Sequence, residues 1–306
     1  MSEQPNLAEL AACTEAARPV LARYLGGEIS AEIALMQLLL ALGGMRPLRE
    51  CLAAMPGHAA TRALQAVMAS NETALVGAAR LVESGLARER TGGIARVREQ
   101  FDRAVAISPE AAVALYSLGS AATLERATAE LVARLDEWQL LGPDLTALDI
   151  GCGIGRLEVA LASRLRAITG VDVSPGMIAQ ARERCAGLAN VDFGVCDGTG
   201  LAIFAGRQFD LILAVDAFPY LVAADPALPE RHITDAAALL SAGGALAILN
   251  FSYRGDLDAD RRVVAALAAR HGFELIRNGT RDFTLWDGAT FLLRKQARLS
   301  APPRRG

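Results

Sequence analysis

The sequence predicts an α/β protein in which an all-helical front half precedes a mostly parallel sheet. Three observations predict this fold. Residues up to about 140 show the apolar spacing of helices and little that resembles a strand. From residue 145 onward, short apolar strands alternate with helical segments, which is typical of a parallel sheet. Between the two halves, residues 145–156 (LTALDIGCGIGR) run from a strand through three glycines into a helix.

Composition narrows the class of protein. The chain has 306 residues and a formal net charge of −3, so it lacks the overall positive charge typical of nucleic-acid-binding proteins. The N-terminus has no basic segment followed by an apolar one, and the longest apolar run, residues 33–42, is too short to span a bilayer. We therefore expect a cytoplasmic protein with neither a membrane nor a nucleic acid as partner. The five cysteines fit neither a zinc pattern nor a disulfide framework, so we expect reduced thiols at Cys13, Cys51, Cys152, Cys185 and Cys196.

Capping signals place the helices of the front half. Ser30 is a suitable N-cap, with an acid in the first turn, for a helix that ends at Gly43. Serine, proline and glutamate at 108–110 begin another helix, which we expect to continue to Gly119. Further helices are expected at 46–55, 59–86 with a break near 84–85, 94–106, and 124–141, the last closed by Gly142 and Pro143. The apolar residues of 33–42 cover most of their helix, which predicts burial against other helices or a partner subunit.

The glycine-rich turn predicts a place where the backbone approaches a ligand closely. It joins a strand at 147–150 to a helix expected at 157–166. Glycines adopt left-handed backbone conformations and lack the Cβ atoms that would keep a ligand away. The dinucleotide fingerprint G-x-G-x-x-G is the main alternative. Here, however, the third glycine comes one position early, and Arg156 stands where that pattern needs glycine or alanine.

With Asp149 two residues before the first glycine, ALDIGCGIG resembles the first motif of class I S-adenosylmethionine (SAM)-dependent methyltransferases. The resemblance implies a Rossmann-like seven-stranded methyltransferase sheet over residues 145 to about 296. It also implies SAM as cofactor and S-adenosylhomocysteine as product. The cofactor-binding residues that this motif implies are Asp149, Gly151, Cys152, Gly153 and Gly155. Cys152 also has a simpler interpretation, as a small residue that fills a tight turn.

Asp172 is a second acid expected at the cofactor. It lies at the end of a strand at 167–173, about 20 residues beyond the glycine turn, where a carboxylate can accept hydrogen bonds from ribose hydroxyls. SAM and NAD both contain such a ribose, so Asp172 indicates a nucleoside without choosing between them. Ser174 and Pro175 then begin a helix at 176–186.

The resemblance implies further cofactor contacts after Asp172. Met177 matches a position that packs against adenine. Asp197, after a strand that begins at 190, matches an acid that accepts a hydrogen bond from the adenine amino group. An aspartate followed by glycine also fits a simple turn. The remaining cofactor-binding residues implied are Val173, Cys196, Gly198, Val215 and Asp216.

A nearly continuous apolar strand at 209–215 ends in DAFPY, which is similar to the family's fourth motif. Residues of that motif line the cleft between the methyl group and its acceptor. Ala217 stands where the [ND]PP[YF] form has an amide or carboxylate, which counts against methylation of nucleobase amino groups. The rest of the expected sheet domain comprises a helix at 233–240, a turn at 242–244, a strand at 245–251, a helix at 258–271, and an antiparallel pair at 273–277 and 290–293.

The resemblance also implies that the helices before the sheet form a lid over the cofactor and part of the acceptor pocket. The candidate pocket residues are Phe101, Tyr116, Ser117, Phe218, Tyr220, Asn250, Ser252, Tyr253 and Arg254. For methyl transfer by in-line displacement, the protein contributes mainly positioning and exclusion of water. The candidate catalytic residues are His232, the histidine closest to the cleft by topology, and Tyr220. We predict no metal site, because no cluster of carboxylates and histidines is visible in the sequence.

The sequence therefore predicts a SAM-dependent methyltransferase that acts on a small-molecule acceptor. The expected domains are a helical lid or dimerisation domain at 1–141, a SAM-binding domain at 142–297 and a basic tail at 298–306. An RNA or protein methyltransferase and a non-catalytic SAM-binding subunit remain alternatives, with a nicotinamide-dependent reductase more distant. The N-terminal helices are also a candidate homodimer interface. The C-terminal end is basic. We interpret it as a solvated segment, which contains Arg294, Lys295, Arg298, Arg304 and Arg305.

Overall fold

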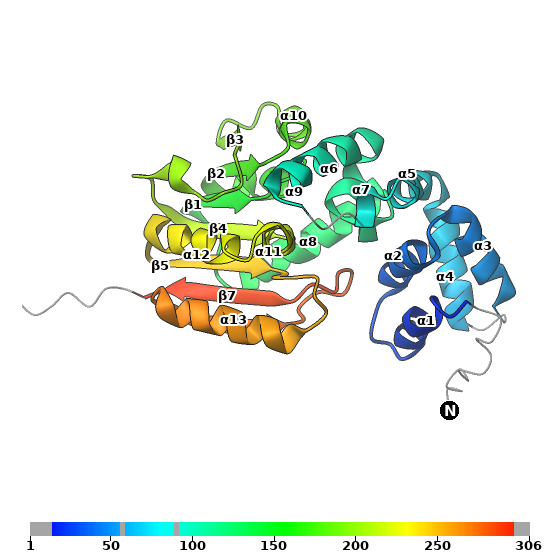
Figure 1. Ribbon diagram of the computed structural model, residues 1–306. Coiled ribbons are helices and arrows are strands. Elements are labelled where there is room, and N and C mark those ends of the chain that lie inside the picture. Colours follow the sequence, from blue (N-terminus) through cyan, green and yellow to red (C-terminus); the bar gives the residue numbers. More distant parts are fainter. Residues whose placement is uncertain (1–13, 56–58, 89–91, 297–306) are drawn as a thin grey trace, which may run out of the picture.

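The computed structural model describes residues 14–55, 59–88 and 92–296. A group of helices lies beside a layered α/β unit, and the chain passes from the first to the second through α8 (Figure 1). Several sequence-based expectations lie outside the described residues: the thiol of Cys13, the break expected after residue 55, and the basic residues Arg298, Arg304 and Arg305.

The front half is helical, as the sequence predicts. Its helices are α1 (Arg18–Leu25), α2 (Ala31–Leu42), α3 (Met45–Ala54), α4 (Ala59–Ser70), α5 (Glu72–Glu83), α6 (Ile94–Ile107), α7 (Pro109–Val113) and α8 (Ala121–Glu137). The hydroxyl of Ser30 accepts a hydrogen bond from Ile33 N at 3.2 Å, and Gly43 ends α2 in a left-handed conformation. The predicted caps of this helix are therefore confirmed.

Three helices differ from the expectation. The helix expected at 59–86 is divided into α4 and α5 at Asn71, whose backbone (φ −114°, ψ 13°) is not helical. The helix that begins at Ser108 ends at Val113, because Ala114 leaves the helical region (φ −156°, ψ 87°) and a 3₁₀ turn, Leu115–Ser117, follows. The continuous helix predicted up to Gly119 is therefore wrong. The last helix of the front half is capped by Ser120 and ends at Glu137, since the chain is already extended from Gly142.

The back half forms a seven-stranded sheet in the order β3-β2-β1-β4-β5-β7-β6. Its strands are β1 (Gly142–Ile150), β2 (Leu165–Asp172), β3 (Val191–Val195), β4 (Phe209–Val215), β5 (Leu240–Leu249), β6 (Phe273–Thr280) and β7 (Thr290–Lys295). Strands β1 to β5 are parallel to one another, and β7 runs antiparallel between β5 and β6. The predicted antiparallel pair is therefore confirmed. The strand order reverses direction between β1 and β4, which is where ligands bind in open α/β sheets.

Helices connect and cover the strands: α9 (Arg156–Leu161), α10 (Pro175–Arg184), α11 (Phe218–Ala224), α12 (Leu228–Leu239) and α13 (Leu257–Arg270). The hydroxyl of Ser174 caps α10 by accepting from Met177 N at 3.0 Å, as predicted. Helix α9 is shorter than expected, because a 3₁₀ turn, Ala162–Arg164, leads directly into β2. Helix α11 was not predicted, since it is short and begins with two aromatic residues and a proline.

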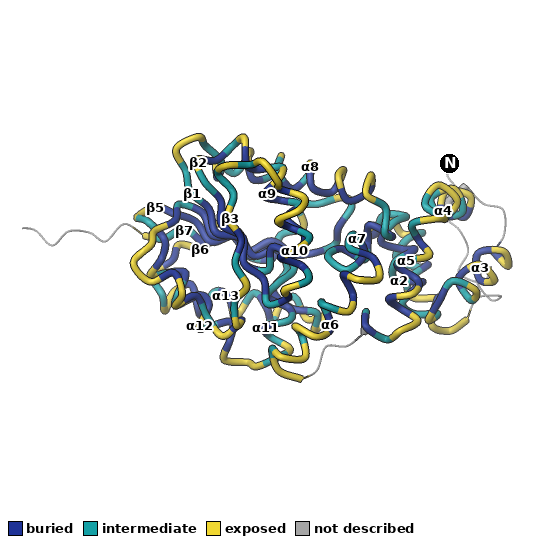
Figure 2. Tube along the Cα trace, turned by 90° about the horizontal axis from the view of Figure 1, so that it is seen from above, coloured by how far each residue is buried: buried dark blue, intermediate teal, exposed yellow. Residues whose placement is uncertain are grey.

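The two faces of the sheet bury different cores. Ala147 and Leu211 belong to the core that continues into the front helices through residues such as Leu35 and Leu131. Leu148 and Ile212 point to the opposite face, where α12 and α13 cover them. Figure 2 shows the strands as the buried centre of this unit. The front helices therefore share one hydrophobic core with the sheet, and this packing holds them above the carboxyl ends of β1 and β4.

Within the described ranges, no single helix is long and apolar enough to cross a membrane. Helices α2 and α3 together pass such a test only as a pair bent by 116°. Arg294 and Lys295 belong to β7 and donate to the carbonyls of Gly243 and Leu240, at 3.1 and 2.5 Å. These two side chains thus contact the sheet, which corrects their assignment to a solvated segment.

Candidate functional site

The glycine turn after β1 is held against its neighbours by close backbone packing. Gly151 and Gly153 have φ values of 75° and 54°, a region that favours glycine. A Cβ atom on Gly153 would lie 2.6 Å from Cγ1 of Val113 in α7, and one on Gly151 would lie 2.7 Å from Cβ of Ala217. The turn therefore needs glycine for both its conformation and its contacts.

Asp172 fixes this turn from the end of the neighbouring strand. One carboxylate oxygen accepts from Gly153 N at 3.0 Å, and the other accepts from Ser174 N at 2.9 Å. Burial raises the pKa of Asp172 to about 6, although both of these hydrogen bonds favour the charged form. The carboxylate thus links β2, the glycine turn and the start of α10.

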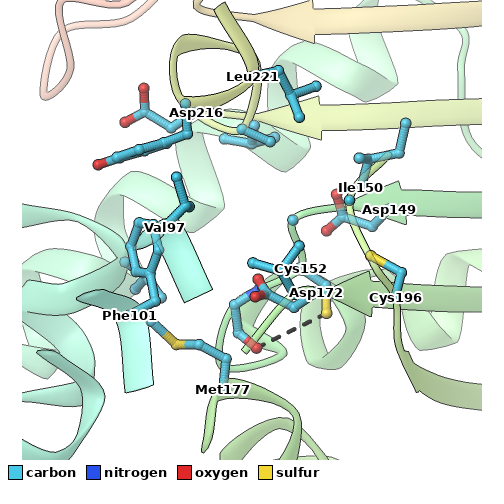
Figure 3. Close-up of a pocket in the computed structure, with 18 of the residues that line it drawn as sticks. Val97, Phe101, Asp149, Ile150, Cys152, Asp172, Met177, Cys196, Asp216 and Leu221 are labelled. Carbon is cyan, nitrogen blue, oxygen red and sulfur yellow. Dashed lines mark hydrogen bonds between the residues drawn. The ribbon is translucent and has the colours of Figure 1, made fainter. Parts of the chain in front are cut away.

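A cavity of about 110 Å³ lies over this turn, and we call it the turn cavity. Figure 3 shows Val97 and Phe101 of α6 on one side and Ile150, Cys152 and Asp172 on the other. The predicted cofactor-binding residues that line it are Asp149, Gly151, Cys152, Gly153, Asp172, Val173, Met177, Cys196, Gly198, Val215 and Asp216. The structure thus brings together predicted residues from the carboxyl ends of four strands, β1 to β4.

A buried pair of carboxyl groups lies next to the glycine turn. Asp149 is 1% exposed, and Glu158 of α9 is fully buried. Burial raises the pKa of both groups, and the nearby charge of Asp149 raises that of Glu158 further. Neither carboxyl oxygen of Glu158 has a hydrogen-bond partner among the described residues. The position of Glu158 within a helix gave no sign of this burial in the sequence.

A second, larger cavity of about 640 Å³ adjoins the first, and we call it the front cavity. Its walls come from the front helices, the ends of β4 and β5, and residues 281–289 between β6 and β7. Five residues line both cavities, so they mark the junction: Phe101, Ala112, Val113, Asp216 and Tyr220. The two cavities are therefore adjacent to each other at these five residues.

Asp216 organises this junction. Its Oδ1 atom accepts hydrogen bonds from Asn250 Nδ2 and Tyr253 Oη, each at 2.8 Å. Asp216 and Asn250 both have left-handed backbones, with φ of 60° and 74°, at the carboxyl ends of β4 and β5. Such conformations are uncommon outside glycine, and aspartate and asparagine tolerate them best. Burial raises the pKa of Asp216, while its two hydrogen bonds lower it.

Comparison with known protein families gives a match that includes the glycine turn and Asp172. Residues 147–244 match the family described as "Methyltransferase domain". These residues are a class I methyltransferase domain. The match confirms the resemblance read from the glycine motif.

The relatives share this domain rather than the whole chain. A demethylmenaquinone methyltransferase of Tropheryma whipplei (strain Twist) is 32% identical over 106 residues, which are 35% of this chain and 41% of that protein. A ubiquinone biosynthesis O-methyltransferase of Coxiella burnetii (strain RSA 493 / Nine Mile phase I) is 28% identical over 139 residues, 44% of this chain and 54% of that protein. The chain thus spans about half the length of the curated relatives it matches.

A solved structure shares the fold over more of the chain. Haemonchus contortus phosphoethanolamine N-methyltransferase 1 superposes with a TM-score of 0.53 at 16% identity, covering 68% of this chain and 50% of that one. At this identity the likeness concerns the fold alone. It agrees with the predicted fold class, a Rossmann-like sheet preceded by helices.

Within the methyltransferase domain, two predicted cofactor residues do not line the turn cavity. The Asp197 carboxylate is exposed and accepts from both the backbone N and the hydroxyl of Thr199, each at 2.9 Å. These bonds lower its pKa and make it the turn residue of the alternative interpretation. Gly155 starts α9 with φ 74°, and its Cβ would meet Ala181 and the ring of Phe193. Gly155 therefore serves helix packing.

The predicted acceptor residues divide in a similar way. Those that line the front cavity are Phe101, Tyr116, Tyr220, Asn250, Ser252 and Tyr253. Phe218 is fully buried against Phe251 and His232. The hydroxyl of Ser117 is buried and donates to the Glu110 carbonyl at 3.4 Å, while the Arg254 side chain pairs with Asp260. These three belong to the core or the loop structure rather than to the cavity wall.

His232 lies in the turn cavity and not among the residues that line the front cavity. Its Nδ1 atom lies 2.9 Å from the Leu228 carbonyl oxygen, which makes Nδ1 the proton donor of this hydrogen bond. Burial lowers its pKa, so the ring is neutral. Its position does not support a role as base for an acceptor in the front cavity, and Tyr220 is the candidate that reaches the junction.

The sequence missed several apolar residues that close the turn cavity. They come mainly from α6, α7 and the segment after β3: Ile94, Val97, Ala112, Val113, Leu201 and Leu221. Apolar residues at helical spacing fit a plain core equally well, so the sequence carried no signal for this wall. Among the described residues, no three His, Cys, Asp or Glu side chains gather as a possible metal site.

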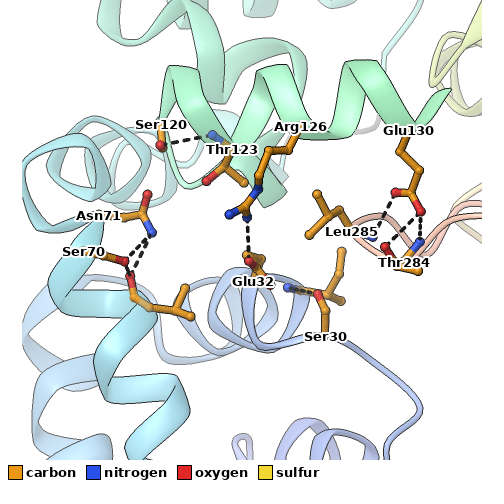
Figure 4. A network of polar contacts seen from close by, with 12 residues as sticks. Ser30, Glu32, Ser70, Asn71, Ser120, Thr123, Arg126, Glu130, Thr284 and Leu285 are labelled. Atoms are coloured by element: carbon orange, nitrogen blue, oxygen red, sulfur yellow. Dashed lines mark hydrogen bonds and ion pairs between the residues drawn. The ribbon is translucent and has the colours of Figure 1, made fainter. Parts of the chain in front are cut away.

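Helix α8 fixes the far wall of the front cavity. The Glu130 carboxylate accepts from the backbone N and hydroxyl of Thr284, at 2.7 and 2.9 Å, and from Leu285 N at 3.3 Å. Arg126 of the same helix forms an ion pair of 2.9 Å with Glu32 of α2 (Figure 4). One helix thus joins the front helices to the segment at 281–289.

Proposed function

We propose that the chain is a SAM-dependent methyltransferase whose acceptor is a small molecule bound in the front cavity. The observation that carries the proposal is the carboxylate of Asp172, hydrogen-bonded to the glycine turn inside a cavity of a methyltransferase domain. The strand order supports it, because β7 lies antiparallel between β5 and β6, whereas the dinucleotide fold has an all-parallel order.

The residues present fit the proposed cofactor. The glycine turn lines the turn cavity, and Asp172 beside it can accept hydrogen bonds from ribose hydroxyls. Met177 and Val97 provide apolar surface for a base. Oδ1 of Asp149 has no hydrogen-bond partner in the described structure, so it can accept one from a ligand. When bound, SAM supplies a methyl group that its positively charged sulfonium has already activated.

The protein's own part is to position the acceptor and exclude water. The side chains of Phe101 and Tyr220 pack edge to face, with ring centroids 4.9 Å apart, at the junction of the two cavities. Helices α6 and α7 cover the glycine turn from the front side. The front cavity lies within the usual range of about 300–1,000 Å³ for small-molecule sites. This size supports a small-molecule acceptor over a macromolecular one.

The proposal is tested by calorimetric titration of the full chain with S-adenosylhomocysteine and with NADH. We expect S-adenosylhomocysteine to bind, and Asp172→Ala to weaken it by about tenfold or more, because hydrogen bonds to a charged group are lost. Asp144→Ala, on the exposed start of β1, is the control and should bind as the wild type does. Binding of NADH in place of S-adenosylhomocysteine would overturn the proposal. The homodimer interface, the domain boundary at 141–142 and the cytoplasmic location stay predictions.

A further inference from the structure

The carboxyl group of Asp216 has no cation as an ion-pair partner among the described residues. Both of its hydrogen-bond donors, Asn250 and Tyr253, are neutral. Arg156 acts on it only at longer range, since its guanidinium donates to the hydroxyl of Thr128 at 3.0 Å. A ligand that brings a positive charge would find a matching partner in this half-buried carboxyl group.

Three aromatic rings surround the same point. Phe101 and Tyr220 meet at 75°, and Tyr220 and Tyr253 meet at 86° with centroids 5.8 Å apart. Successive rings at nearly right angles form a corner rather than a stack, and we call these three residues the aromatic corner. Faces of aromatic rings attract cations, and they do so more strongly where water is excluded. The aromatic corner and Asp216 thus both favour a ligand with a positively charged group.

The rest of the front cavity also favours a positive ligand group. Its two lining arginines are already engaged: Arg23 lies 3.5 Å from Glu28 and 3.9 Å from Asp287, and Arg281 donates to the Asp287 carbonyl. Asp216 and Asp256 line the cavity without an ion pair to a described residue. An acceptor with a carboxylate or phosphate beside the junction would therefore meet like charge.

We propose that the acceptor is an amine, and that its nitrogen is methylated while it donates a hydrogen bond to Asp216 and lies against the aromatic corner. This inference rests on the proposed function. The amine binds as an ammonium ion and first loses one proton to water. The lone pair that this frees forms the new N–CH₃ bond as the S–CH₃ bond breaks, and the electron pair of the broken bond stays on sulfur. The nitrogen becomes positively charged, and its proton then passes to the Asp216 carboxylate or to water. Asp216 and the rings thus stabilise the charge that develops on nitrogen.

The cavity also indicates what the amine is attached to. Apolar side chains line the front cavity without lining the turn cavity: Met36, Leu40, Leu81, Leu86, Leu115 and Trp286. The rings of Tyr116 and Trp286 lie 6.5 Å apart in the wall of the front cavity. We therefore expect an amine that carries an apolar or aromatic group.

The test measures binding to the full chain saturated with S-adenosylhomocysteine. The probes are 2-phenylethylamine and tryptamine, each paired with the alcohol and the carboxylic acid of matching skeleton. We expect each amine to bind about tenfold more tightly than its alcohol, because it adds a charged hydrogen bond and cation–π contacts. Each acid should bind least tightly.

Two variants locate the preference. Asp216→Asn keeps the size of the side chain and tolerates the left-handed backbone, so we expect folding to survive and the preference for amines to disappear. Asp225→Asn, whose carboxylate is exposed and bonded to Ala227 N, is the control and should keep the preference. Alcohols that bind as tightly as the amines, or a preference that survives Asp216→Asn, would overturn the inference. Failure of S-adenosylhomocysteine to bind would instead count against the proposed function, so the two failures are distinguishable.

Discussion

Addition of one methyl group at Gly153 tests the contact between the front helices and the cofactor turn. In Gly153→Ala the new Cβ would lie 2.6 Å from Cγ1 of Val113 and 3.6 Å from its Cβ. The left-handed backbone itself costs about 1–2 kcal/mol for a residue other than glycine. The forced overlap with a stiff β-branched side chain adds about 1–3 kcal/mol. We expect a total loss of about 2–5 kcal/mol in the free energy of unfolding.

Two further variants separate these causes. Gly187→Ala has φ of 91° and nothing within 4 Å of its Cβ, so it should show the backbone cost alone. Val113→Ala should cost about 1 kcal/mol by itself, because it deletes two partly buried methyl groups. Combined with Gly153→Ala it leaves only an ordinary Cβ contact, so the double variant should recover about 1–3 kcal/mol of the sum of the single losses.

Urea unfolding of the four variants and the wild type gives these free energies, and calorimetry with S-adenosylhomocysteine gives the effect on binding. We expect Gly153→Ala to weaken binding and the added Val113→Ala change to restore most of it. If Gly153→Ala costs no more than Gly187→Ala, and Val113→Ala rescues neither quantity, then the close packing of α7 on the glycine turn is refuted.

Three other predictions concern charge and the far wall. Folding raises the pKa of Asp172 from its usual 3.8 to about 6, so stability that is present at pH 4 is lost as the pH rises through 6. In urea unfolding, the stability of Asp172→Asn relative to the wild type should therefore be about 2.4 kcal/mol greater at pH 8 than at pH 4. An unchanged difference would contradict the raised pKa. The stability of Glu158→Gln relative to the wild type should likewise be greater at pH 8 than at pH 5, because burial raises the pKa of Glu158. Urea unfolding at the two pH values measures this difference. Glu130→Ala should lower the free energy of unfolding by about 1 kcal/mol and speed proteolysis within residues 281–289, while Glu125→Ala on the exposed face of α8 should do neither.

Local signals in the sequence predicted much of the fold correctly. The strand at 209–215 was predicted with its observed bounds, because a central parallel strand is a continuous apolar run. The serine caps at Ser30 and Ser174 were also predicted, since the capping hydroxyl lies within three residues of its partner. The glycine turn and Asp172 came together as expected, because both lie at the carboxyl ends of adjacent parallel strands.

Features that depend on distant contacts could not be predicted. The end of α7 at Val113 follows from the backbone of Ala114, and neither residue type marks a helix end. The carboxyl group of Glu158 is buried because α9 packs over β2, which a charged residue in a helical pattern does not indicate. Asp216 was assigned to the cofactor from the motif. Its hydrogen-bond partners Asn250 and Tyr253 lie 34 and 37 residues further along the chain, and only the structure shows these contacts.

The most direct test of the account is a crystal structure of the chain with S-adenosylhomocysteine. The account predicts the ribose hydroxyls within hydrogen-bond distance of Asp172 and the sulfur atom directed toward the junction at Asp216 and Tyr220. The front cavity should then remain free for an acceptor. A ligand bound away from the glycine turn, or a sulfur atom directed away from that junction, would contradict the central claim that the two cavities are the cofactor and acceptor sites of a methyltransferase.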